Sequence, residues 1–78
     1  MKKERVLLEK YRSDRKITVS IVAEVIGVSE ARVLSWEQGK TLPITSALKK
    51  LSWFYGIPEV RFGVDKDFRL VVEVLCEW

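Results

Sequence analysis

The stretch from Gly27 to Pro43, "GVSEARVLSWEQGKTLP", constrains what this chain can fold into more than any other. Ser29 is a residue type that caps helix N-termini, and the mixed polar and apolar run behind it predicts a helix over residues 30–38. Gly39 is typical of the left-handed residue that follows a helix, and Pro43 prevents the next segment from extending it. We therefore expect a short helix with well-defined ends.

A second short helix is predicted immediately upstream, over residues 19–25. Thr18 can cap it, and Gly27 can leave it through a positive φ. About three residues then separate two short helices, which is the arrangement of a helix-turn-helix. An ordinary helical hairpin in a small bundle has similar spacing, so spacing by itself leaves both interpretations open.

Similar signals predict further helices over residues 3–15, 45–55 and 58–62. In the first of these, Val6 and Tyr11 belong to an apolar face surrounded by charged residues. Thr45 or Ser46 can begin the second, and Gly56 ends it. Pro58 suits the first turn of the last. The resulting count is five helices.

The C-terminal segment, "DKDFRLVVEVLCEW", has a different pattern. Its alternating, valine-rich sequence predicts a strand from about residue 68 to 75, although its apolar residues also share one helical face, so an all-α fold with a C-terminal helix is the alternative. A strand here would expose an unpaired edge, and pairing with a second copy would satisfy that edge. The residues predicted to mediate this dimerisation are Phe68, Leu70, Val72 and Val74.

Composition excludes several classes of function. The chain has no His and one Cys, which leaves no usual zinc pattern, no internal disulfide and no catalytic constellation, so we expect neither an enzyme nor a cofactor. No apolar run is long enough for a transmembrane helix and the N-terminus lacks the features of a signal peptide, so we expect a cytoplasmic protein with no membrane partner.

Residues 1–16 carry seven basic and three acidic side chains, whereas residues 57–78 carry three basic and five acidic side chains. This asymmetry indicates a polyanionic partner, or else only a solvated, lysine-rich helix.

Residues 8–63 resemble the DNA-binding domain of the phage repressor/Cro family, often called Xre-like. The resemblance rests on Ala23, Gly27, Val28, Ser29, Val33, Trp36, Glu37, Gly39, Lys40 and Pro43. It implies a mainly α fold: a compact five-helix, lambda-repressor-like helix-turn-helix domain over residues 1–63. Residues 64–78 would then be a tail, with a C-terminal strand used in dimerisation.

The resemblance also implies an ion pair between Arg12 and Glu37 that ties the first helix to the third. The alternative is two exposed charges that contribute almost nothing. Val19 departs from the family pattern, which commonly has Gln there to donate to a phosphate. Ile21, Val25 and Trp53 are apolar where polar residues are common. We expect the tail or a second subunit to cover this apolar surface.

In a helix-turn-helix the N-terminal residues of the second helix reach base edges in the major groove. The candidate base contacts are Glu30, Ala31, Arg32 and Ser35. Arg32 is the strongest, because its fork matches guanine, although a solvated arginine is the alternative. Glu30 could accept from cytosine or simply stabilise the helix N-terminus. The candidate phosphate contacts are Thr18, Lys40 and Thr41.

These observations predict a sequence-specific DNA-binding protein, a Cro-type transcriptional repressor that acts as a homodimer on a pseudo-palindromic operator. The alternative is a protein-interaction module on the same fold, such as an antitoxin that uses its apolar tail and second helix to bind a protein partner. Steep salt dependence of binding to duplex DNA would favour the first function.

Overall fold

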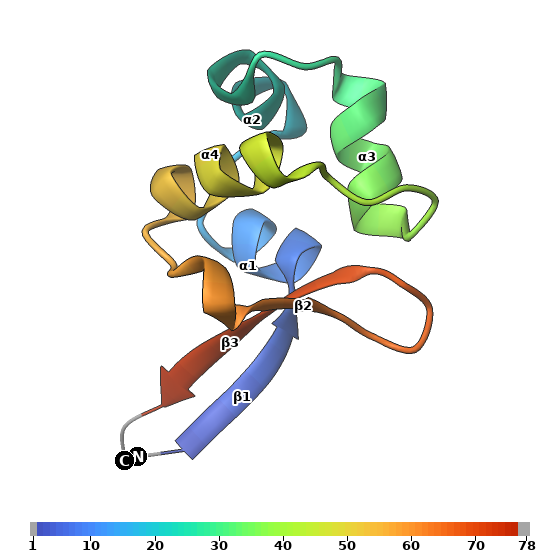
Figure 1. The fold of residues 1–78 in the computed structure, drawn as a ribbon. Coiled ribbons are helices and arrows are strands. Elements are labelled where there is room, and N and C mark those ends of the chain that lie inside the picture. Colours follow the sequence, from blue (N-terminus) through green and yellow to red (C-terminus); the bar gives the residue numbers. More distant parts are fainter. Residues whose placement is uncertain (1, 77–78) are drawn as a thin grey trace.

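The computed structural model describes the backbone of residues 2–76 and the side chains of residues 4–74. Within that range the chain forms an α+β domain whose helices lie on one side of a three-stranded antiparallel sheet (Figure 1). The elements in chain order are β1 (Lys2–Leu7), α1 (Leu8–Asp14), α2 (Val19–Ile26), α3 (Glu30–Gln38), α4 (Thr45–Tyr55), the 3-10 turn η1 (Glu59–Arg61), β2 (Phe62–Val64) and β3 (Leu70–Cys76). The predicted five-helix, mainly α class is therefore wrong.

The N-terminal part of the predicted first helix is a strand. Residues 2–7, "KKERVL", contain good helix formers, yet they pair along their whole length with β3. Val6 lies opposite Val72 in this antiparallel ladder, and Leu7 still has extended φ and ψ angles where α1 begins. Pairing with a strand more than 60 residues away overrides local helix propensity, which amounts to only a few tenths of a kcal/mol per residue.

The predicted fifth helix is also wrong, because the chain makes a single 3-10 turn at Glu59–Arg61 before it enters β2. The predicted C-terminal strand is present as β3, so the alternative of a C-terminal helix is wrong. β3 is the central strand, in the order β1-β3-β2, with Phe62 and Val6 on either side of Val72. The first and last segments of the chain thus complete one sheet.

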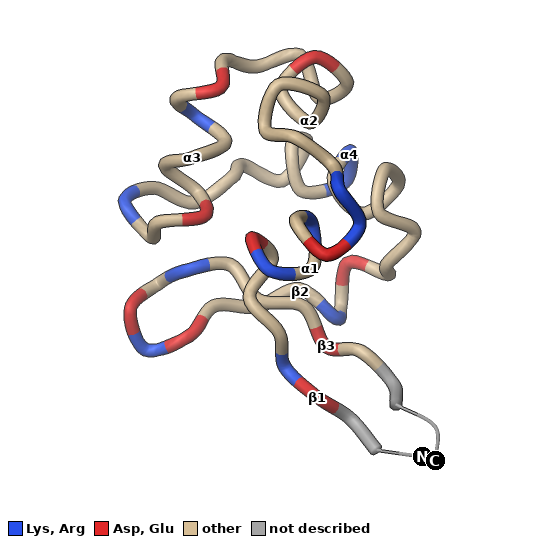
Figure 2. The backbone as a smooth tube through the Cα atoms, turned by 180° about the vertical axis from the view of Figure 1, so that it is seen from behind, with Lys and Arg blue, Asp and Glu red and all other residues tan. Residues whose placement is uncertain are grey.

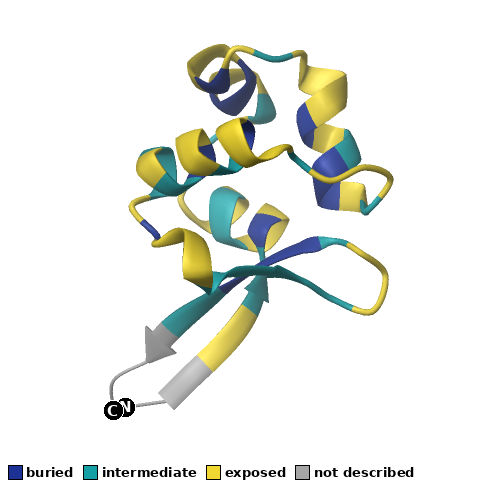
Figure 3. Cartoon of the chain, in the orientation of Figure 1, coloured by how far each residue is buried: buried dark blue, intermediate teal, exposed yellow. Residues whose placement is uncertain are grey.

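One core joins the helices to the sheet (Figure 3). Val72 is fully buried, and Leu70 beside it is almost so; both pack in the same cluster as the buried face of the helix-turn-helix. The helical members of this cluster are Leu8, Val22, Ala23, Ile26, Val33, Trp36, Ala47 and Leu51. Leu70 and Val72, from the segment after residue 63, therefore belong to the same core as the helices. No helix in the described part of the chain is long and apolar enough to cross a membrane.

Candidate nucleic-acid interface

The α2–turn–α3 unit has its ends fixed by side-chain and backbone hydrogen bonds. Thr18 Oγ1 accepts from the Ile21 N–H at 3.2 Å, and Ser29 Oγ accepts from the Arg32 N–H at 3.2 Å. Both are N-caps of the kind that satisfy otherwise unpaired helix donors. Between them Gly27 has a φ of 86°, and its N–H donates to the Ala23 carbonyl at 2.8 Å. The sequence predicted both caps and this left-handed glycine.

The inner side of α3 is fastened to α1 by the Arg12–Glu37 ion pair. Arg12 Nε donates to Glu37 Oε2 at 2.8 Å and Arg12 Nη2 donates to Oε1 at 3.1 Å, so the contact is bidentate. Arg12 Nη1 also donates to the Ile17 carbonyl at 2.8 Å. The side chains are only 11% and 1% exposed, so this is a buried pair and the surface alternative does not apply. The hydrogen bond to Glu37 raises the pKa of Arg12, more than burial lowers it.

Tyr55 lies beside this pair. Its ring makes edge-on contacts with Tyr11 and Phe54, at centroid distances of 5.8 and 4.9 Å. Its hydroxyl is buried and has no hydrogen-bond partner among the described residues. Burial, followed by the nearby Glu37 carboxylate, raises the pKa of Tyr55 well above its usual value of 10.0. The position of Tyr55 near this ion pair was not indicated by the sequence pattern.

The outer side of α3 is solvent-exposed at its N-terminal half. Glu30, Ala31 and Arg32 are exposed, as predicted for residues that could reach base edges. Ser35 is half-buried, and its hydroxyl lies 2.8 Å from Thr41 Oγ1. Arg32, Ser35 and Thr41 line one shallow groove between α3 and the loop that follows it. The Ser35–Thr41 bond links two predicted contacts, one for a base and one for a phosphate.

Lys40 is exposed at the start of this loop, and Thr18 is exposed at the N-terminus of α2. Lys50 is exposed, and its Nζ donates to the Ile26 carbonyl at the end of α2, at 3.3 Å. Lys50 and Arg32 line the same groove between the α2–α3 turn and the beginning of α4. Lys50 thus adds a positive charge near Arg32. A sequence signal for this contact is hard to define, since it joins residues 24 positions apart.

The predicted dimerisation residues lie in β3, the central strand of the sheet, or just before it. Leu70 and Val72 are buried in their own domain, and β3 pairs with β1 over Val71–Cys76 and with β2 over Leu70–Val72. Phe68 precedes the strand and is exposed, and Val74 is half-buried. β1 therefore pairs with one edge of β3 along Val71–Cys76, whereas β2 pairs with the other edge only over Leu70–Val72. Dimerisation through this strand stays a prediction. β1 is itself an edge strand of the sheet, and its charged sequence discourages strand addition.

The apolar residues that depart from the family pattern stay uncovered. Ile21 and Val25 are exposed on α2, and Trp53 is 77% exposed on α4. The tail does not pack on them, so of the two predicted covers only the second subunit stays a prediction. Leu34 is also exposed, on α3. In the part of the chain that the structure describes, no three His, Cys, Asp or Glu residues are arranged to hold a metal ion.

Comparisons with protein-family models, with curated proteins and with solved structures gave no match to this chain.

Proposed function

We propose that this protein binds duplex DNA sequence-specifically, as a small transcriptional regulator of the repressor/Cro type, with α3 in the major groove. The observation that carries the proposal is the way α3 is held. Its N-terminus is capped by Ser29, its buried end is fastened by the bidentate Arg12–Glu37 pair, and its exposed half carries Arg32. A helix whose buried side is anchored to the domain and whose polar side faces solvent suits recognition of the major groove. Anchoring the helix limits the positions of the side chains that would contact base edges.

Each candidate residue has a role in this proposal. Arg32 donates two hydrogen bonds to a guanine, Glu30 accepts from a cytosine amino group, and Ala31 contacts a thymine methyl. Lys40 and Thr41 contact phosphates, and the N-terminus of α2 at Thr18 supplies backbone donors to another. The Ser35–Thr41 hydrogen bond holds the loop close to α3, so base and phosphate contacts keep a fixed spacing.

One helix-turn-helix reads only a few base pairs, so we propose that two copies bind half-sites about 34–36 Å apart. β1 pairs with β3 over Val71–Cys76 and β2 pairs with it over Leu70–Val72, so this binding does not require β3 to pair with a second copy. Two copies that meet only weakly in solution can still bind adjacent half-sites, because the DNA places them side by side.

A protein-interaction module is the second candidate, and a specific observation favours it. Ile21 and Val25 are one helical turn apart on α2, and both are exposed, as is Leu34 on α3. Exposed apolar side chains on neighbouring helices are typical of protein contacts rather than of phosphate contacts. An antitoxin that binds both DNA and a protein would use both kinds of surface.

The test is selection of duplexes from a random pool, followed by a salt titration on the selected site. We expect the logarithm of affinity to fall steeply and linearly with the logarithm of salt concentration. Arg32→Ala should abolish base preference at one position per half-site, at a cost of about 1–3 kcal/mol. Lys40→Ala should weaken binding to all duplexes alike and lower the salt slope by about one.

Lys10→Ala is the charge-matched control. Lys10 pairs with Asp14 on α1 and lines a hollow with β1 and β3 residues, so its loss should change affinity little. If no sequence is enriched from the pool, and the Arg32→Ala variant binds duplex DNA as tightly as the unaltered chain, sequence-specific recognition is rejected.

A further inference from the structure

The turn between β2 and β3, residues 65–69, lies against the C-terminal end of α3 (Figure 1). A Cβ atom on Gly39 would collide with the Asp67 carbonyl oxygen and would lie 3.0 Å from the Phe68 carbonyl carbon and 3.1 Å from the Arg69 nitrogen. The two backbones therefore touch at the residue directly before Lys40. The β2–β3 turn extends the surface of α3 past the end of the helix.

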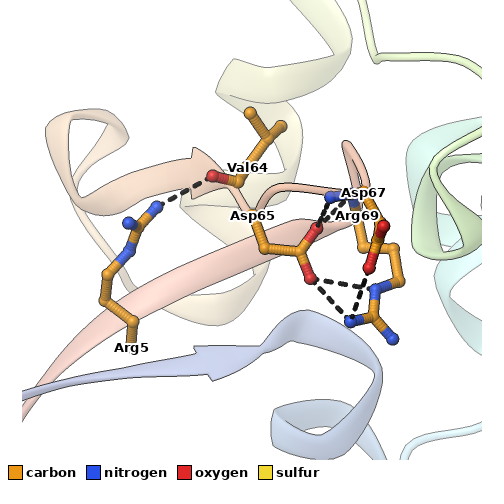
Figure 4. Close-up of polar contacts among 5 residues, drawn as sticks. All are labelled: Arg5, Val64, Asp65, Asp67 and Arg69. Atoms are coloured by element: carbon orange, nitrogen blue, oxygen red, sulfur yellow. Dashed lines mark hydrogen bonds and ion pairs between the residues drawn. The ribbon is translucent and has the colours of Figure 1, made fainter.

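The turn is held rigidly. Asp65 Oδ1 accepts from the Asp67 and Arg69 N–H groups, each at 2.9 Å, and Arg69 Nε donates to Asp65 Oδ2 at 2.9 Å (Figure 4). At its start, Arg5 Nη2 donates to the Val64 carbonyl at 2.9 Å. A turn fixed at both ends presents its tip in one orientation.

Phe68 has a backbone conformation and an exposure that stabilisation of the fold does not explain. Its φ is 63°, a left-handed conformation that glycine or asparagine adopts readily and that is a genuine outlier for a bulky side chain. The side chain is 61% exposed, so its burial in the domain does not explain the choice. Strained residues of this kind persist where the surroundings determine them, and they are frequent at binding sites.

Of the two basic residues in the turn, Arg69 is paired with carboxylates of described residues and Lys66 is not. Arg69 Nη2 lies 2.8 Å from Asp65 Oδ2 and 3.5 Å from Asp67 Oδ2, so both carboxylates face the same guanidinium. Lys66 is exposed and forms no ion pair with another described residue. Figure 2 shows the resulting alternation of basic and acidic residues along the turn.

We propose that the β2–β3 turn is a second DNA contact, in which Lys66 meets a phosphate and Phe68 packs on the neighbouring deoxyribose, just outside the bases that α3 reads. This inference rests on the proposed function, since the turn would touch the same duplex as Lys40. Phosphate and sugar contacts fix the position of a protein along the duplex but do not distinguish one base from another. The turn therefore adds affinity and sets the position of α3 in the groove.

The test compares Phe68→Gly, Lys66→Ala and the unaltered chain on the duplex selected for the latter. Glycine suits the left-handed backbone, so Phe68→Gly should keep or raise the thermal midpoint while it weakens binding roughly tenfold, through loss of apolar contact area. Lys66→Ala should lower the salt slope by about one at unchanged sequence preference. Trp53→Ala, a control that removes an aromatic side chain exposed on α4, should leave affinity unchanged.

Affinity for a set of shortened duplexes provides a second measurement, which a change in the folding stability of the variants would not affect. Removing the base pairs beyond the end of α3 should weaken binding by the unaltered chain, and should weaken Phe68→Gly and Lys66→Ala much less. If the unaltered chain binds its site and both variants bind equally well, the turn is not a contact and only this inference fails. If the unaltered chain binds no duplex selectively, the proposed function fails and this inference with it.

Discussion

Replacing Arg12 by alanine should destabilise the domain strongly, because it breaks the buried Arg12–Glu37 ion pair. The substitution removes two charge-assisted hydrogen bonds to Glu37, at 2.8 and 3.1 Å, and the donor to the Ile17 carbonyl. It leaves the Glu37 carboxylate, which is 1% exposed, without a counter-charge. The cost of an unpaired buried charge of this kind is about 3–5 kcal/mol.

That magnitude is large compared with the stability of a small domain, which is typically about 5–15 kcal/mol. For a chain of this size each kcal/mol shifts the thermal midpoint by about 4–8 °C, so Arg12→Ala should lower it by roughly 12–40 °C. Urea denaturation followed by circular dichroism at several protein concentrations measures the change directly, and gives the free energy of unfolding by linear extrapolation.

The double variant Arg12→Leu/Glu37→Leu separates the charge from the packing. It removes both charges, so the main remaining penalty is the unsatisfied Ile17 carbonyl, at about 1–3 kcal/mol. The double variant should therefore be more stable than Arg12→Ala, although it carries one more substitution. A loss below about 1 kcal/mol for Arg12→Ala, the range of exposed pairs, would refute the reasoning. So would a double variant that loses the full sum of the two single changes.

Three further predictions concern the turn regions and the core. Gly39→Ala should destabilise the domain by about 2 kcal/mol or more, because the added Cβ meets the β2–β3 turn. Gly27 has a similar φ but open space around it, so Gly27→Ala should cost only about 1–2 kcal/mol. Equal losses of unfolding free energy in urea denaturation would argue against contact between the turn and Gly39. Tyr55→Phe should be neutral or stabilising by up to about 1 kcal/mol, since it removes a buried, unpartnered hydroxyl, and a clear loss would indicate a missed partner. Burial acts to raise the pKa of Asp65, but hydrogen bonds from Arg69 and Asp67 lower it below 3.8. The turn should therefore keep its structure above about pH 4 and loosen only as the pH falls through this lowered pKa, which the amide resonances of Asp67 and Arg69 would report.

Local chemistry was sufficient to predict helices α2 and α3 and the turn between them. Thr18 and Ser29 cap α2 and α3 as their residue types suggested, and Gly27 and Gly39 have the positive φ that ends each helix. These features depend on residues within four positions of one another, so a single sequence contains all the information they need. The residues of the candidate site that lie on α3 were predicted for the same reason.

The sheet could not be predicted in this way. Residues 2–7 have helix propensity, and only β3 makes them a strand. The alternation in β3 indicated a strand but not its neighbours, so it did not show that β3 pairs with β1 and β2 of the same chain. The contact of the β2–β3 turn with Gly39 joins residues about 28 positions apart, and it too was invisible in the sequence.

Residue types and their spacing alone predict where helices α2, α3 and α4 end, which side of α3 is apolar, and that β3 is a strand. Tertiary structure decided the fold class, the fate of the N-terminal segment and the burial of Leu70 and Val72. The physical reason is the range of the interactions involved. Capping, left-handed glycines and helical periodicity act over a few residues, whereas strand pairing satisfies backbone groups with partners anywhere in the chain. Which partner wins depends on the shared core, and that core exists only once the chain is folded.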